Sequence, residues 1–217
     1  MAVRPRLRPV PGRFITLEGG EGVGKSTQAR ALAAALRSRG IDVVETREPG
    51  GSDGAEAIRR LLLEGGADRW NARAEALLFA AARADHVEKM IKPAISRGKW
   101  VICDRFLDSS LAYQGGADGL GDQPIQALHC IGSEGYLPDR TLLLDMPVYD
   151  ASIRQFAAGI GQSDRFEKRD GAFHDKVAAA FRELASRDPD RIRVINAEGA
   201  PEEVTGRLLV ALADLLP

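Results

Sequence analysis

A glycine-rich segment near the N-terminus constrains the fold of this chain more than any other feature. Residues 19–26, GGEGVGKS, match the pattern G-x-x-x-x-G-K-[ST] at every position. An apolar run at residues 14–18 precedes the segment, and apolar residues at helical spacing follow it from Ala29 to Leu36. Glycines let the backbone curve around an anion, and the N-terminus of the next helix directs unpaired N–H groups toward it. The pattern therefore predicts a strand, a phosphate-binding loop and a helix in succession.

The predicted loop provides several groups suited to a nucleotide. Lys25 would reach the β and γ phosphates, and the hydroxyl of Ser26 would take one position around Mg²⁺. Glu21 is unusual in such a loop because a carboxylate repels phosphates. The residues expected to bind the nucleotide are Gly19, Gly20, Glu21, Gly22, Val23, Gly24, Lys25, Ser26 and Thr27.

Short apolar runs alternate with helical patterns along the rest of the chain. Strands are predicted at residues 14–18, 42–46, 100–103, 141–144 and 193–195. Helices are predicted after the loop, at 55–63, at 72–97 with a kink or break at Pro93, and from Pro201 onward. Strands that are apolar without alternation are buried on both faces. The fold class is therefore α/β, a doubly wound five-stranded parallel sheet with helices on both faces.

Charge, cysteine content and hydropathy exclude several classes of function. The 30 Lys and Arg residues nearly balance 31 Asp and Glu, which disfavours a duplex-binding surface or a basic membrane anchor. Two cysteines cannot form a disulfide framework or a zinc quartet, and no run reaches the ~18 apolar residues of a membrane span. We therefore expect a cytoplasmic protein without a nucleic acid or membrane partner, with a flexible tail at 1–12 and one domain at 13–217.

The ends of two predicted strands separate classes of nucleotide-binding protein. No N-K-x-D tetrapeptide occurs, as a guanine-specific switch would require, and neither strand ends in paired acids. The third strand ends in Asp104-Arg105 instead. Asp104 can hold Mg²⁺ or its water, while Arg105 can bind a second phosphate group with its guanidinium fork. This combination favours phosphoryl transfer over a switch or motor function.

From residue 14 to residue 167 the chain resembles the bacterial thymidylate kinases. The matching segments are GGEGVGKST at 19–27, TREPGG at 46–51, EALLFAAARADHVEKMIKPA at 75–94, CDRFLDSSLAYQG at 103–115, PDRTLLLD at 138–145 and DRFE at 164–167. The resemblance implies a P-loop fold of the nucleoside-monophosphate kinase type, ATP with Mg²⁺ as phosphoryl donor, and dTMP as acceptor. It also implies dTDP as product and a homodimer.

The resemblance assigns an acceptor site to particular residues. Phe79 would stack on thymine and Arg83 would bind its edge, although spacing alone favours a core role for Phe79. Arg59 and Arg105 would contact the acceptor phosphate, but Arg59 by itself reads as a solvated helix charge. Tyr113 would crowd a ribose 2′-hydroxyl, and Glu21 would act near the 3′-hydroxyl. The remaining residues implied at the sugar and base are Glu48, Ser109, Ser110 and Gln114, of which the two serines are also typical helix caps.

A small-residue segment at about 155–167 departs from the family pattern. Members with no basic residue in the phosphate loop usually carry arginines in a flap, yet residues 155–163, QFAAGIGQS, have no positive charge. Our hypothesis is that Arg154, Arg165 or both close over the transferring phosphoryl group, with Lys25 and Arg105 as the other catalytic cations. Asp164 and Glu167 would be partners of this flap, and the composition fits a plain surface turn equally well.

Other functions stay open at this stage. The acceptor of a kinase with this loop could be another deoxynucleotide, or a deoxynucleoside with Glu48 as the base near its 5′-hydroxyl. A non-catalytic nucleotide switch would retain the loop and have no use for Phe79, Arg83, Arg105 and Tyr113. His86, His129 and His174 lack metal-ligand spacing, and the sequence assigns them no role.

Overall fold

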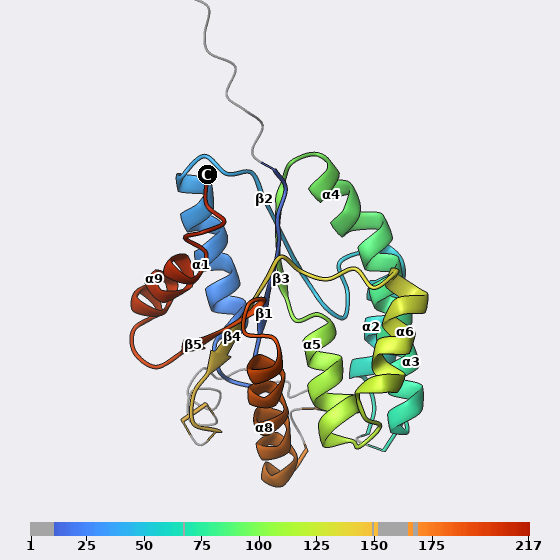
Figure 1. Ribbon diagram of the computed structural model, residues 1–217. Helices are drawn as coiled ribbons and strands as arrows, with labels where there is room; N and C mark the ends of the chain where they lie inside the picture. The colour runs from blue at the N-terminus through green and yellow to red at the C-terminus, as the bar shows by residue number, and fades with distance from the viewer. Residues whose placement is uncertain (1–10, 67, 149, 152–164, 167–168) are drawn as a thin grey trace, which may run out of the picture.

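A parallel five-stranded sheet forms the centre of the protein (Figure 1). The computed structural model describes residues 11–66, 68–148, 150–151, 165–166 and 169–217. The sheet order is β2-β3-β1-β4-β5, and every neighbouring pair is parallel. The strands are β1 (Phe14–Glu18), β2 (Val43–Arg47), β3 (Trp100–Asp104), β4 (Arg140–Asp145) and β5 (Ile192–Asn196). The predicted α/β class and its parallel sheet are confirmed, with strand ends within two residues of expectation.

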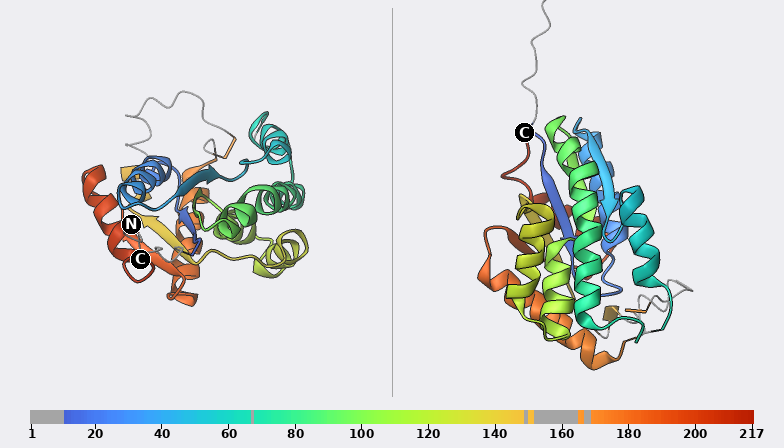
Figure 2. Two further views of the ribbon diagram at one scale, coloured as in Figure 1. Left: turned by 90° about the horizontal axis from the view of Figure 1, so that it is seen from above. Right: turned by 90° about the vertical axis from the view of Figure 1, so that its right-hand side faces the viewer.

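Helices cover both faces of the sheet (Figures 1 and 2). One face packs against α1 (Lys25–Ser38) and α9 (Pro201–Ala211). The opposite face carries α3 (Ala72–His86), α5 (Leu107–Ser110), α6 (Asp122–Ser133) and α8 (Gly171–Arg187), while α2 (Asp53–Leu63) packs against α3. The sheet is therefore the middle of three layers, as its apolar strands require.

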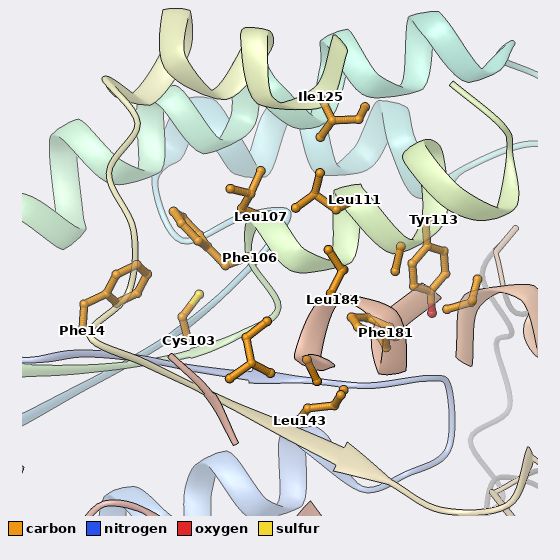
Figure 3. Packing of buried hydrophobic residues seen from close by; sticks show 14 of the residues in the cluster. Phe14, Cys103, Phe106, Leu107, Leu111, Tyr113, Ile125, Leu143, Phe181 and Leu184 are labelled. Atoms are coloured by element: carbon orange, nitrogen blue, oxygen red, sulfur yellow. The ribbon is translucent and has the colours of Figure 1, made fainter. Parts of the chain in front are cut away.

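Alternate side chains of the strands enter two separate cores. Phe14, Cys103 and Leu143 point toward the α3–α8 side, where they pack with residues such as Phe106 and Phe181 (Figure 3). Their neighbours along each strand point to the α1–α9 side, because successive side chains of a strand alternate between faces. Those neighbours include Ile15, Leu17, Ile102, Leu142 and Leu144.

The helix expected at 72–97 is divided into three parts. After α3 the chain forms a π-helical turn, η1 (Val87–Ile91), and then the short helix α4 (Lys92–Ser96). Pro93 lies in the first turn of α4, where its missing N–H removes no hydrogen bond. The widened turn thus accommodates the proline by restarting the helix. A second π-helical turn, η2 (Leu111–Ala117), follows α5.

The strands deliver their carboxyl ends, and the loops that follow them, to one edge of the sheet. At this edge lie the glycine-rich loop after β1, the 48–51 turn after β2 and the 104–106 segment after β3. Ligands of doubly wound folds bind at such an edge. Within the described part of the chain, no helix has the length and apolar character needed to cross a bilayer.

Candidate functional site

A cleft of about 640 Å³ lies over the carboxyl edge of the sheet and collects most of the predicted site. It is lined by residues from the glycine-rich loop, the 48–51 turn, α2, α3 and the segment that follows β3. The predicted residues that line it are Glu21, Gly22, Val23, Gly24, Lys25, Ser26, Thr27, Glu48, Arg59, Phe79, Arg83, Asp104, Arg105, Ser109, Ser110, Tyr113 and Gln114. Gly19 and Gly20 form the start of the same loop and line a smaller hollow behind it.

The glycine-rich loop has the backbone that its sequence demands. Gly19 has a φ of 138°, and a Cβ there would lie 2.4 Å from the carbonyl oxygen of Leu144. Gly24 has a φ of 94° and leads directly into α1, whose first turn carries no acidic residue. Unpaired N–H groups at the start of a 14-residue helix therefore meet the cleft, as anion binding requires.

Lys25 is buried at the floor of this loop, where its Nζ donates to the carbonyl oxygen of Gly20 at 2.5 Å. Burial, followed by repulsion from Arg105, lowers the pKa of Lys25, while Glu21 and Asp104 oppose that change. A bound anion would favour the charged ammonium in the same way as these carboxylates. Lys25 is therefore placed to neutralise a phosphate.

Ser26 and Asp104 together form a candidate position for a divalent cation. The Ser26 hydroxyl donates to Oδ2 of Asp104 at 2.5 Å, and Oδ1 of Asp104 is buried with no hydrogen-bond partner among the described residues. A buried carboxylate oxygen without a partner requires an explanation, and a hard cation with oxygen ligands supplies one. Among the residues described, no group of three His, Cys, Asp or Glu forms a cation site. Phosphate oxygens and water would complete the coordination, as Mg²⁺ prefers.

Arg105, Glu21 and Tyr113 form a cluster beside the loop. Arg105 donates to Oε1 of Glu21 at 2.6 Å and to the carbonyl oxygen of Gly19 at 3.0 Å. The Tyr113 hydroxyl donates to the same Glu21 oxygen at 2.8 Å, and the guanidinium lies 5.2 Å from the Tyr113 ring centre. Arg105 adopts a φ of 69°, the left-handed region that favours glycine.

The charge of Glu21 depends on these neighbours. Burial acts to raise the pKa of Glu21, but Arg105 and then Lys25 outweigh burial and lower it to about 2. Burial raises the pKa of Tyr113 well above its ordinary value, so the phenol keeps its proton. The unusual acid of the loop is thus an ionised carboxylate held between a guanidinium and a phenol.

Glu18 is a site residue that sequence reasoning missed. It ends β1 with no exposed surface and accepts hydrogen bonds from the backbone N–H of Phe106 at 2.7 Å and the Ser109 hydroxyl at 2.6 Å. Because that hydroxyl gives its proton to Glu18, its lone pairs face Arg105, which donates to it at 3.1 Å. Burial, then the nearby Asp108, raises the pKa of Glu18 to about 7. An acid at the end of a largely apolar run, FITLE, was the available signal.

Arg83 has two nitrogens engaged and one left for a ligand. Its Nε donates to Glu48 Oε2 at 2.8 Å, and Nη2 donates to Ser110 Oγ at 2.8 Å and to the carbonyl oxygen of Phe106 at 3.1 Å. No partner for Nη1 occurs among the residues that the structure describes, and Arg83 lines the cleft. Nη1 is therefore the nitrogen that can bind a nucleobase edge.

Phe79 and Arg59 lie on either side of this pocket. Phe79, four residues before Arg83 on α3, is partly buried with its ring centre 5.7 Å from that of Phe166. Phe79 thus both packs on the core and lines the cleft, which confirms contact with the core and leaves stacking on thymine as a prediction. Arg59 donates from Nη1 to the carbonyl oxygen of Pro49 at 2.7 Å, which draws it toward the cleft.

Of the two arginines expected at the flap, only Arg165 lies within the described residues. Arg154, Asp164 and Glu167 lie outside the described residues. Arg165 is 1% exposed, pairs with Glu75 at 2.6 Å and donates to the carbonyl oxygen of Leu62 at 2.7 Å. The structure does not bring Arg165 into the lining of the cleft.

The cleft continues past the glycine-rich loop to a region that sequence reasoning did not assign. Gln28 of α1, Ala197 and Gly199 after β5, and Pro201 and Val204 of α9 line this end. Gln28 donates to the carbonyl oxygen of Pro201 at 3.0 Å, which joins α1 to α9. The parallel topology was the available signal, because the loop after β5 must reach the same edge of the sheet.

Comparison with known proteins gives a consistent result. The thymidylate kinase family model matches residues 17–207. A thymidylate kinase of Rhizorhabdus wittichii is 79% identical over 96% of this chain and all of its own length. A thymidylate kinase of a Bradyrhizobium species is 49% identical over 91% of this chain and 88% of its own. The crystal structure of thymidylate kinase from Ehrlichia chaffeensis, 32% identical, superposes with a TM-score of 0.74 over 93% of this chain and 98% of its own.

Proposed function

We propose a role for each part of the cleft from the premise that this chain belongs to the thymidylate kinase family and phosphorylates dTMP to dTDP with ATP. The observation that carries the assignment is the cleft itself. In it the buried Lys25 and the partly buried Arg105 lie between a phosphate-binding loop and a pocket lined by Phe79 and Arg83. A donor triphosphate and an acceptor monophosphate can thus lie end to end.

The residues near the loop offset the repulsion between the two phosphate groups, and the transfer needs no general base. The phosphate of dTMP has a second pKa near ~6, so it is largely dianionic at neutral pH and nucleophilic without assistance. Two unit charges 4 Å apart repel by about 4 kcal/mol at an effective dielectric of 20. Lys25 on the donor side and Arg105 on the acceptor side offset this repulsion. Glu21 holds the Arg105 guanidinium in place through the 2.6 Å contact.

Ser26 and Asp104 are the residues that we propose to hold Mg²⁺. Bound Mg²⁺ would neutralise developing charge on the β and γ phosphates. The support is Oδ1 of Asp104, which has no partner within the described part of the chain and lies beside the Ser26 hydroxyl. Asp104 is the last residue of the buried strand β3, so its carboxylate is fixed relative to the loop.

The acceptor nucleoside would occupy the pocket between α3 and η2. Phe79 offers a ring face to thymine, and Nη1 of Arg83 offers a donor to its carbonyl edge. Tyr113, held by Glu21, would stand where a ribose 2′-hydroxyl projects. Arg59 would contact the phosphate, with Glu48, Ser109, Ser110 and Gln114 lining the sugar and base. The adenosine of ATP would take the end of the cleft between α1 and α9.

We also retain the homodimer that the resemblance implies. Leu77 of α3 is 57% exposed and Ile131 of α6 is 83% exposed, and these two helices lie side by side (Figure 2). Large exposed apolar side chains on adjacent helices are typical of an interface. Light scattering of the purified protein, with Ile131→Arg as the disrupting variant, tests the dimer. The cytoplasmic location expected from the sequence stays a prediction.

A coupled assay of ADP release tests the function against its alternatives. The acceptors to compare are dTMP, dUMP, dCMP, dGMP, AMP and thymidine. We expect turnover with dTMP to exceed turnover with each other acceptor. Activity with thymidine alone would instead indicate a nucleoside kinase, and ADP formation with none of these acceptors would point to a nucleotide switch.

A further inference from the structure

His86 is a buried titratable side chain for which the reaction has no direct use. It is the last residue of α3, three positions after Arg83, and has no exposed surface. It is absent from the lining of the cleft and so does not reach a bound nucleotide. A polar ring buried in this way must be satisfied by protein groups.

Both ring nitrogens of His86 have close partners. Nδ1 lies 3.0 Å from Oε1 of Glu48, and Nε2 lies 2.7 Å from Oγ1 of Thr46. The other oxygen of the same carboxylate, Oε2, accepts from Nε of Arg83. Glu48 is therefore held at both oxygens, by the imidazole on one side and the guanidinium on the other.

The partners determine which nitrogen carries a proton. Glu48 pairs with Arg83 as a carboxylate and can only accept, so the proton of the His86 bond must sit on Nδ1. Nε2 of a neutral ring then accepts from the Thr46 hydroxyl. The carboxylate and guanidinium already balance each other's charge, so a neutral ring adds no uncompensated charge to the interior.

We propose that His86 is a positioning residue for nucleobase selection: it fixes Glu48, and Glu48 fixes Arg83. With Nε of Arg83 tied to Glu48, and Nη2 tied to Ser110 and Phe106, Nη1 stays directed at the cleft. Loss of the Nδ1–H donor releases one oxygen of Glu48, which can then rotate and compete for other Arg83 protons. This inference rests on the proposed role of Arg83.

A glycine in the 48–51 turn supports the same role for His86. A Cβ on Gly51 would lie 2.4 Å from Nε2 of His86 and 2.4 Å from Oγ1 of Thr46. The turn thus closes directly over the hydrogen bond between them. The carbonyl oxygen of Pro49 in this turn accepts from Arg59, so the imidazole also supports the wall on the phosphate side.

Two substitutions of similar size separate the hydrogen bonds of His86. The amide nitrogen of His86→Asn falls near the position of Nδ1 and can still donate to Glu48. The amide of His86→Gln falls near Nε2, so it keeps the link to Thr46 and lacks the donor to Glu48. His86→Leu fills the space without either bond. His129→Gln is the control, because His129 is also buried, donates from Nε2 to the carbonyl oxygen of Tyr136 and lies outside the cleft.

Steady-state kinetics with dTMP, dCMP and ATP test the proposal on the full-length enzyme. We expect His86→Gln and His86→Leu to raise KM for dTMP about tenfold and to lower the preference for dTMP over dCMP. KM for ATP should stay within twofold, because Lys25 and the loop are not involved. His86→Asn should retain most of the preference, and His129→Gln should match the wild type.

The outcomes distinguish positioning from packing and from a failure of the function itself. Equal preferences for dTMP over dCMP in the Asn and Gln variants would overturn the proposal. It would also be overturned if the loss of preference across the variants simply tracked the fall in their unfolding temperatures. A double substitution of His86→Leu with Glu48→Gln should lose little more than Glu48→Gln by itself, and additive losses would contradict the chain of contacts. Absence of dTMP turnover in the wild-type enzyme would contradict the proposed function instead.

Discussion

The hydroxyl of Ser26 lies 2.5 Å from a carboxylate oxygen of Asp104, which joins the first turn of α1 to the end of β3. These two residues are 78 positions apart in the chain. The second oxygen of Asp104 is buried and has no partner in the ranges that the structure describes. The parallel sheet is what brings a loop residue and a strand-end residue to this common point.

Asp104→Asn should weaken the enzyme's use of Mg²⁺. The amide keeps a hydrogen bond to Ser26 but loses the negative charge that attracts a cation. We expect the Mg²⁺ concentration for half-maximal rate to rise by roughly tenfold or more, the usual loss of metal affinity when a residue around a metal is substituted. Titration of the rate with MgCl₂ at saturating ATP and dTMP measures this shift. An unchanged titration curve would remove Asp104 from the cation site.

Lys25→Ala should abolish most turnover while dTMP still binds. In the proposed function the lysine would face the donor phosphates, whereas Phe79, Arg83 and Tyr113, which also line the cleft, would form the acceptor pocket. Loss of one charge-stabilising donor lowers kcat by roughly 100-fold or more. Calorimetric titration with dTMP should give a dissociation constant near that of the wild type. A parallel loss of dTMP binding would show that Lys25 belongs to the acceptor side.

Arg83→Ala should reduce the preference for dTMP over dCMP more than it changes the affinity for ATP. It should also lower the free energy of unfolding by about 3 kcal/mol, because Glu48 then stays buried without its cationic partner. Kinetics with both acceptors and urea unfolding measure the two effects. Arg83→Ala combined with Glu48→Gln should recover part of the stability without the preference. Unchanged preference in a stable variant would exclude Arg83 from base recognition.

Glu18→Gln should flatten the dependence of stability on pH between about 5 and 7. In the folded protein the pKa of Glu18 is raised from 4.5 to about 7, first by burial and then by Asp108. Between these values the folded state holds a proton that the unfolded state has lost, so unfolding free energy falls as pH rises. The fall amounts to roughly 3 kcal/mol and ends above the folded-state pKa. Urea unfolding at pH 5, 6, 7 and 8 checks this, and equal slopes in both proteins would contradict it.

Arg165→Ala separates two roles for this arginine. Its ion pair with Glu75 of α3 and its hydrogen bond to the carbonyl oxygen of Leu62 of α2 connect Arg165 to both helices. If this connection is its main role, the unfolding temperature should fall and KM for dTMP should rise through the nearby Phe166. A closing role over the phosphoryl group would instead lower kcat far more than it changes either KM. Arg154→Ala, measured beside it, tests the other arginine of the sequence hypothesis.

Local patterns were enough to predict the sheet and the phosphate loop. Strands buried on both faces are continuous apolar runs, so β1, β3 and β4 stand out in the sequence. The glycine-rich loop is equally visible, because few other residues can adopt the backbone of Gly19 and Gly24. The resemblance then assigned residues to an acceptor pocket, which stays a prediction, and those residues line one cleft.

Features that depend on tertiary contacts escaped prediction. The kink or break at Pro93 was expected, but its form, a π-helical turn at 87–91, is not encoded in apolar spacing. The burial of Arg165 depends on Glu75, which is 90 positions earlier in the chain. Glu18 reads as the end of a strand, and its importance emerges only when Phe106 and Ser109 fold over it.

The left-handed backbone of Arg105 has a consequence for laboratory evolution. Glycine would adopt this φ without the cost, on the order of 1 kcal/mol, that a side chain imposes. Glycine would also leave the carboxylate of Glu21 without the guanidinium that donates to it at 2.6 Å, and breaking such a pair costs more than the backbone strain. A screen for heat resistance alone would therefore retain arginine at this position together with its strained backbone.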